Sequence, residues 1–174
     1  PFDDVNFRLA LAYATNRQEI IDVAMDGMAE STDVLWTEEW AGDSDVYRCK
    51  PYDVEKAKEY LAKSNYNGET ITYVAGSDEY KKIGVVLQEQ YKAVGINMEV
   101  EQLETNTWVS DMMNGNYDIT FTGMSFDLDV DLWKNALHSS AIGGYNFSRL
   151  NNAEVDAAFD KGTAILDEAE RAKN

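Results

Sequence analysis

Apolar residues recur at helical spacing in the first 27 residues. A helix is predicted over residues 1–15, where Pro1 and Asp3 favour its start. Its apolar face consists of Val5, Leu9, Ala12 and Tyr13. Asn16 and Glu19 have the spacing of a capping box, so a second helix is predicted to begin at once and to end near Gly27. The pattern predicts two short helices that meet at a sharp corner.

Periodicity then disappears between residues 28 and 52. This length is unusual for a structureless loop, and the segment contains several aromatic residues among acids: Trp36, Trp40 and Tyr47. We expect these rings to pin the segment to the body of the protein, and a lid is the alternative. Asp53 then caps a predicted helix, whose apolar stripe contains Ala57, Tyr60 and Leu61.

The middle of the chain reads as strand, helix and strand. Residues 70–75 are rich in β-formers, residues 79–94 repeat at helical spacing up to Gly95, and residues 96–103 alternate apolar with polar positions. A right-handed crossover with parallel or near-neighbouring strands in one sheet is expected from such a unit.

The remaining pattern predicts four further elements. They are a helix over 105–113 that carries Trp108 and Met112, a strand over 117–123, a short helix around 132–137, and a final helix capped by Asn151 or Asn152. The apolar face of that last helix would contain Val155, Phe159, Ile165 and Leu166. We therefore predict that residues 1–174 form a single α/β lobe, with a mixed, mostly parallel sheet flanked by helices.

Composition narrows the functional classes. The 174 residues include 32 acidic and 15 basic side chains, so the net charge of −17 disfavours binding to nucleic acid or to anionic membranes. The lone Cys49 cannot form an intramolecular disulfide and is expected to be partly buried. The chain begins at Pro1 and ends in a helical pattern without a stop signal, from which we expect a fragment of a longer protein.

Residues for catalysis are scarce. His138 is the only histidine, and a structural or surface role is expected for it because a catalytic base also needs an oriented partner. The sequence has no nucleophile elbow, no Walker loop and no dinucleotide-binding glycine motif after a strand. We therefore expect no enzyme activity, no metal and no cofactor.

Two alternatives depend on Asp127, Asp129 and Asp131. Their spacing is similar to the start of a calcium loop, but Leu132 and His138 stand where that loop requires Gly and Glu. A hydrolytic domain with paired carboxylates is the second alternative. Glycosidase carboxylates lie about 5–9 Å apart across a sugar, a geometry that neighbours in one loop rarely reach.

The stretch from Gly123 to Asp127 follows the carboxyl end of a predicted strand, where open α/β sheets collect ligands. A carboxylate there can bind a ligand ammonium, and an extended ligand can pair with strand-edge groups. Asp127 could equally cap the following helix. Residue type and position alone leave both interpretations open.

Five segments, in order, resemble the family 5 extracellular solute-binding proteins, the oligopeptide, dipeptide and nickel binders of ABC importers. The segments are "PFDDVNFRLALAYATNRQEII", "YDVEKAKEYLAKSNY", "LQEQYKAVGINMEVEQLETNTW", "NGNYDITFTGMSFDLD" and "NNAEVDAAFDKGTAILDEAERAK". The resemblance covers nearly the whole chain. It implies a lobe of the type II periplasmic-binding-protein fold, inserted in a two-lobed clamp whose other lobe is absent here.

The resemblance also implies a site. Asp127 corresponds to the family aspartate that binds the amino terminus of a peptide, and Met124, Ser125 and Phe126 to the residues that pair with the peptide backbone. Gly123 and Asn146 complete the predicted set of ligand-binding residues. Implied partners are a peptide and the permease of an ABC importer, for a monomeric extracytoplasmic lipoprotein, in the periplasm or on the outer face of the membrane, anchored outside this segment.

Departures from the family pattern make the ligand less certain than the family. Met124 stands where Trp is usual, so a flexible thioether replaces a stacking surface. Asp131 replaces a frequent Pro, and Asn16 replaces Asp ahead of Arg17. An oligosaccharide or another solute therefore stays open as the ligand.

Overall fold

The computed structural model describes residues 1–33, 48–125 and 130–171. The chain divides into two compact units. The first contains Pro1–Trp108 and Tyr117–Thr122, and the second contains Val109–Asn116 and Gly123–Asn174. The prediction of one lobe over residues 1–174 stays a prediction.

The first unit is built around a parallel sheet with the strand order β2-β1-β3. β1 (Thr70–Ala75) pairs with β2 (Asn97–Gln102) on one side and with β3 (Ile119–Thr120) on the other. The predicted strand–helix–strand unit is confirmed, because α5 (Asp78–Val94) connects β1 to β2. β3 is shorter than predicted: the carboxylate of Asp118 accepts the Thr72 N–H at 2.8 Å, so a side chain replaces a backbone acceptor where the strand would begin.

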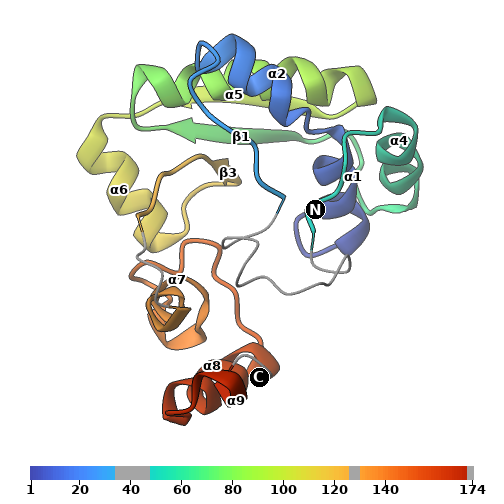
Figure 1. The fold of residues 1–174 in the computed structure, drawn as a ribbon. Coiled ribbons are helices and arrows are strands. Elements are labelled where there is room, and N and C mark those ends of the chain that lie inside the picture. Colours follow the sequence, from blue (N-terminus) through green and yellow to red (C-terminus); the bar gives the residue numbers. More distant parts are fainter. Residues whose placement is uncertain (34–47, 126–129, 172–174) are drawn as a thin grey trace. The chain divides into compact units, whose positions relative to one another are not determined.

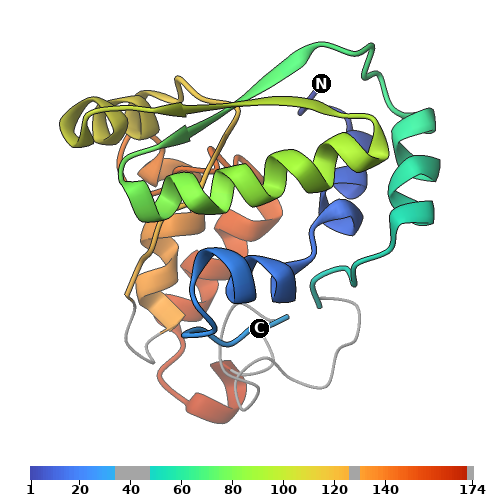
Figure 2. The ribbon, with the colours of Figure 1, turned by 90° about the horizontal axis from the view of Figure 1, so that it is seen from above.

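Two pairs of helices complete the first unit. α5 lies along the sheet with α2 (Arg17–Ala24) beside it, and α1 (Val5–Ala14) lies beside α4 (Val54–Lys63) (Figures 1 and 2). Gln90 of α5 ties α2 in place: its side chain accepts the Asn16 N–H and donates to the Asn16 carbonyl, both at 3.1 Å. The core lies between helices and sheet, and its largest fully buried apolar side chains are Tyr73, Phe7, Ile71 and Ile96.

The predicted apolar face of α1 is mostly wrong. The buried residues are Phe7, Ala10, Leu11, Tyr13 and Ala14, whereas Val5 is 53% exposed. Aromatic partners from outside the helix decide this, since Phe7 stacks on Tyr66 with the ring centroids 5.2 Å apart. Asp4 caps α1 by accepting the Asn6 N–H at 2.7 Å.

Most of the predicted helix caps are confirmed. Capping depends on residues within one turn of the helix end, so the sequence alone can indicate it. Asn16, Asp53 and Asn152 each accept a backbone N–H in the first turn of the helix that follows. Gly95 ends α5 with the left-handed φ of 97°. Cys49, in contrast, is exposed, so the expectation of a partly buried thiol is wrong.

The second unit consists of short helical elements. α6 (Thr105–Asn114) begins in the first unit and ends in this one, and η2 (Val130–Trp133), α7 (Lys134–Leu137), η3 (Ser139–Ala141), α8 (Ala153–Ala164) and α9 (Glu168–Arg171) follow. The predicted final helix is too long. The Ile165 carbonyl accepts two bonds from the Arg171 guanidinium, at 3.0 and 2.7 Å, and this turn leaves Leu166 91% exposed.

Candidate functional site

The carboxyl ends of three parallel strands meet at one edge of the sheet. Ala75 of β1 lies opposite Gln102 of β2, and Val74 lies opposite Thr120 of β3. Ligands of open α/β sheets bind outside this edge. The residues just beyond the strand ends are therefore the candidates for contact with a ligand.

Trp108 is fixed across the ends of β1 and β3. Its indole N–H donates to the Thr120 hydroxyl at 2.9 Å, and that hydroxyl donates to the Val74 carbonyl at 2.8 Å. Its ring lies against Gly76 so closely that a Cβ at Gly76 would be 2.3 Å from two ring carbons. Only glycine permits this approach of backbone to ring. Trp108 is 8% exposed and acts as a rigid support for the edge.

An aromatic cluster extends from this support. Tyr80, in the first turn of α5, lies 5.6 Å from Trp108 and 5.3 Å from Phe121, measured between ring centroids. Tyr80 and Phe121 are half-buried, so part of each ring remains available to an apolar or aromatic group. Neither was predicted as a site residue, although Tyr80 follows the predicted strand over 70–75 within a few positions and Phe121 lies near the carboxyl end of the predicted strand over 117–123, which is a usable signal.

The charge at this edge is negative. Asp78 accepts a hydrogen bond from Gln102 at 2.8 Å, and Glu104 accepts backbone N–H groups of Asn106 and Thr107 at the start of α6. From Ala93 to Trp133 the sequence contains eight acidic residues and no Lys, Arg or His. The structure adds one basic side chain from outside this stretch, because the Arg149 guanidinium donates to the Met113 carbonyl at 3.3 Å.

The predicted ligand-binding residues fall into three groups. Gly123, Met124 and Ser125 are exposed and lie three to five residues after the end of β3 at Thr120, with Met124 38% exposed. Phe126 and Asp127 lie outside the described residues, as do Asp129 and the side chain of Asp131. Contact between these residues and a ligand stays a prediction.

Asn146 organises a loop of the second unit. It is 1% exposed; its amide nitrogen donates to the carbonyls of His138 and Leu150, and its oxygen accepts from Leu150 N–H and from the Ser148 hydroxyl. These bonds use all the hydrogen-bonding positions of the side chain. Its predicted contact with a ligand is not tested by this arrangement, which gives it a definite role in shaping the loop.

Within residues 1–33, 48–125 and 130–171 no cluster of three His, Cys, Asp or Glu side chains is arranged to hold a metal ion. No helix among these residues is long and apolar enough to cross a membrane. The calcium alternative depends on aspartates outside the described part.

Residues 1–143 match the family model of the bacterial extracellular solute-binding proteins, family 5, middle region. The chain belongs to this family. Among curated relatives, heme-binding protein A of Haemophilus influenzae is 30% identical over 99% of this chain and 33% of its own length. The chain thus spans about a third of the length of that relative.

Solved structures confirm the predicted fold, a lobe of the type II periplasmic-binding-protein class. The oligopeptide-binding protein AppA of Bacillus subtilis, in complex with a nonapeptide, superposes with a TM-score of 0.80 at 28% identity over 99% of this chain and 38% of its own. The PBP AgaA of A. tumefaciens R10, in complex with agropinic acid, gives a TM-score of 0.87 at 26% identity over 99% of this chain and 37% of its own.

Proposed function

We propose that residues 1–174 are one lobe of an extracytoplasmic solute-binding protein that captures an oligopeptide and delivers it to the permease of an ABC importer. Membership of family 5 carries this proposal. The lobe supplies a binding surface and performs no chemistry on the ligand. The full-length protein is monomeric and lipid-anchored outside this segment in the same proposal.

The ligand-facing surface is proposed at the carboxyl edge of the sheet. Gly123, Met124 and Ser125 follow β3 as exposed chain, so their backbone groups are accessible to an extended ligand. Within the first unit, Tyr80 and Phe121 offer ring surface supported by Trp108. Backbone pairing gives affinity for any peptide, and the rings favour apolar or aromatic side chains.

The amino terminus of the peptide is proposed to bind Asp127, as the family resemblance implies. The absence of basic residues between Ala93 and Trp133 supports a cationic partner. A hydrogen bond between charged groups contributes about 1.5–3 kcal/mol, which corresponds to about tenfold to a hundredfold in affinity.

Calorimetric titration of the full-length protein tests this. A peptide pool and its N-acetylated counterpart are compared for wild type, for Asp127→Asn and for the matched control Asp129→Asn. Acetylation and Asp127→Asn should each weaken binding about tenfold or more, and Asp129→Asn should change it little. Equal affinity for free and acetylated peptides would contradict the role of Asp127.

The same samples separate the remaining alternatives. Mass spectrometry should recover bound peptide intact after prolonged incubation, since no reaction is expected. Saturable binding of an oligosaccharide with no binding of peptide would reject the peptide class and leave the family assignment standing. Stimulation of the ATPase of a reconstituted permease would test the delivery step.

A further inference from the structure

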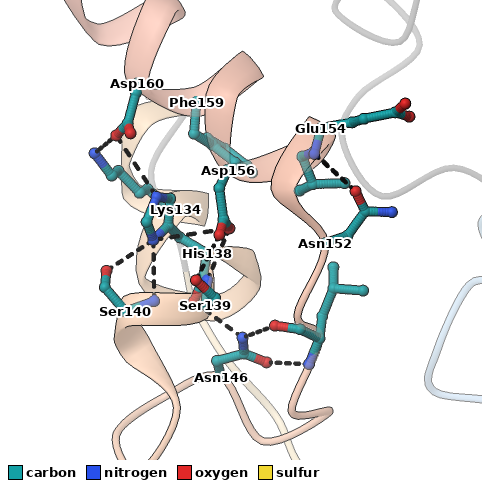
Figure 3. A network of polar contacts seen from close by, with 12 residues as sticks. Lys134, His138, Ser139, Ser140, Asn146, Asn152, Glu154, Asp156, Phe159 and Asp160 are labelled. Atoms are coloured by element: carbon teal, nitrogen blue, oxygen red, sulfur yellow. Dashed lines mark hydrogen bonds and ion pairs between the residues drawn. The ribbon is translucent and has the colours of Figure 1, made fainter.

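His138, the only histidine of the chain, lies between two carboxylates of α8 (Figure 3). Its Nδ1 is 3.8 Å from Asp156 Oδ1 and its Nε2 is 3.6 Å from Asp160 Oδ1. The side chain is 12% exposed, so the ring is held at the junction of α7, η3 and α8. This position agrees with the predicted structural role and adds a specific electrostatic environment.

The hydrogen bonds of the ring define its neutral form. Nδ1 accepts the Ser140 N–H at 3.1 Å and lies 2.7 Å from the Ser140 hydroxyl oxygen, so His138 caps η3. A backbone N–H can only donate, so the neutral ring carries its proton on Nε2. That nitrogen is buried and has no hydrogen-bond partner within the described part of the chain.

Both carboxylates are held in the ionised form. Bonds from the Ser139 hydroxyl at 2.5 Å and from the Ser139 N–H at 2.9 Å keep the pKa of Asp156 below its usual value. A bond from the Lys134 ammonium at 2.5 Å lowers the pKa of Asp160 in the same way. The charged groups around the ring are therefore two carboxylates from α8 and one ammonium from α7, which is already paired.

We propose that His138 is a proton-dependent latch that docks α8 more tightly onto α7 and η3 when the ring takes up a proton. Protonation adds an N–H on Nδ1, toward the Ser140 hydroxyl and Asp156, and it places a positive charge on the ring, whose Nε2–H already faces Asp160. The positive charge of the ring then lies within 3.8 Å of the carboxylates of Asp156 and Asp160, whereas only the hydrogen bond from the Ser140 N–H loses its acceptor.

The latch also reaches the loop organised by Asn146. The His138 carbonyl accepts a bond from Asn146 at 3.0 Å, so the residue that senses protons is also an anchor of that loop. Acidification should therefore reduce the opening of α8 and of residues 138–150 together. This device goes beyond solute capture, and its measurement needs no ligand.

Hydrogen exchange of the full-length protein at pH 7.5 and 5.5 tests the latch, with rates corrected for intrinsic exchange. In wild type, the protection of α8 amides should rise about threefold or more at pH 5.5, as expected for two partly exposed ion pairs. His138→Asn can still cap Ser140 but cannot titrate, so its α8 protection should not respond to pH. Asp160→Asn should reduce the response.

Glu154→Gln is the matched control, since Glu154 lies on the same helix and its carboxylate points away from the ring (Figure 3). It should respond as wild type does. A wild-type response of zero or opposite sign, or an equal response in His138→Asn, would overturn the latch. If His138→Asn does not fold, NMR titration of wild type decides: α8 amide shifts must follow the His138 ring resonance with one midpoint, and independent curves would reject the proposal.

Discussion

The contact between Gly76 and Trp108 allows a sharp prediction for Gly76→Ala. The added Cβ would lie 2.3 Å from two ring carbons of Trp108, whereas carbon atoms pack at about 3.5–4.0 Å. The φ of Gly76 is not in the left-handed region, so alanine is allowed there by the backbone. The substitution therefore tests the space between backbone and ring alone.

The expected loss of local stability follows from the contacts that Trp108 would lose. A shift of about 1 Å would break the indole bond to Thr120, which contributes about 0.5–1.5 kcal/mol, and overpacking a closed site costs about 1–3 kcal/mol. Together they lower the local stability by about 2–4 kcal/mol, which corresponds to a decrease of about 30-fold or more in amide protection.

Hydrogen exchange of β1 amides in the full-length protein is the assay. Gly144→Ala is the matched control, because Gly144 also has no left-handed φ and its nearest atom would be the Ala141 carbonyl oxygen at 3.3 Å. Gly76→Ala should release β1 and weaken binding of ligand, and the control should do neither. Protection of β1 equal in both variants would refute the argument that Trp108 is rigidly held.

Three further predictions concern local stability, the first measured by hydrogen exchange and the other two by urea unfolding. Asn146→Ala should lower the stability of the loop over residues 138–150 by about 3 kcal/mol, because buried backbone groups lose their partners, and exposed Asn151→Ala should be neutral. Arg149 has a left-handed φ of 54°, so Arg149→Gly should be more stable than Arg149→Ala by about 1 kcal/mol in urea unfolding. The hydrogen bond from the Asn6 N–H lowers the pKa of Asp4, so the ionised Asp4 carboxylate stabilises α1 at neutral pH, and this stabilisation is lost as pH falls below about 4. Asp4→Ala should abolish this part of the pH dependence of stability, measured by urea unfolding at a series of pH values. Asp3→Ala should retain it.

Local chemistry explains what the sequence predicted correctly in the fold. The caps at Asn16 and Asp53 and the stop at Gly95 depend on residues within one helical turn. The buried face of α1 could not be found in this way, because Phe7 is buried by Tyr66, which is distant in sequence. The same limit applies to β3, whose start is set by the bond between Asp118 and Thr72.

The candidate site was predicted only in outline. Its location at a strand end followed from the alternation of apolar residues and from the family resemblance. The support that Trp108 gives to this edge could not be predicted, because nothing in the sequence around Gly76 indicates that an indole from α6 lies against it. Tyr80 and Phe121, which the sequence did not single out as site residues, are half-buried at the edge where ligands are expected.

The residues that support the carboxyl edge of the sheet differ from the exposed residues that follow it, and this difference bears on which ligand is bound. The relatives that superpose on the chain include one in complex with a nonapeptide and one in complex with agropinic acid, so one lobe architecture accommodates different ligands. Trp108, Thr120 and Gly76 fix the edge through contacts with one another. Exposed side chains just past the edge, such as Met124, can change without disturbing those contacts. Specificity should therefore transfer with the segment after β3: replacing Met124 by Trp should alter which ligands bind while leaving the exchange of β1 amides unchanged. A loss of β1 protection would show that support and surface are not separable.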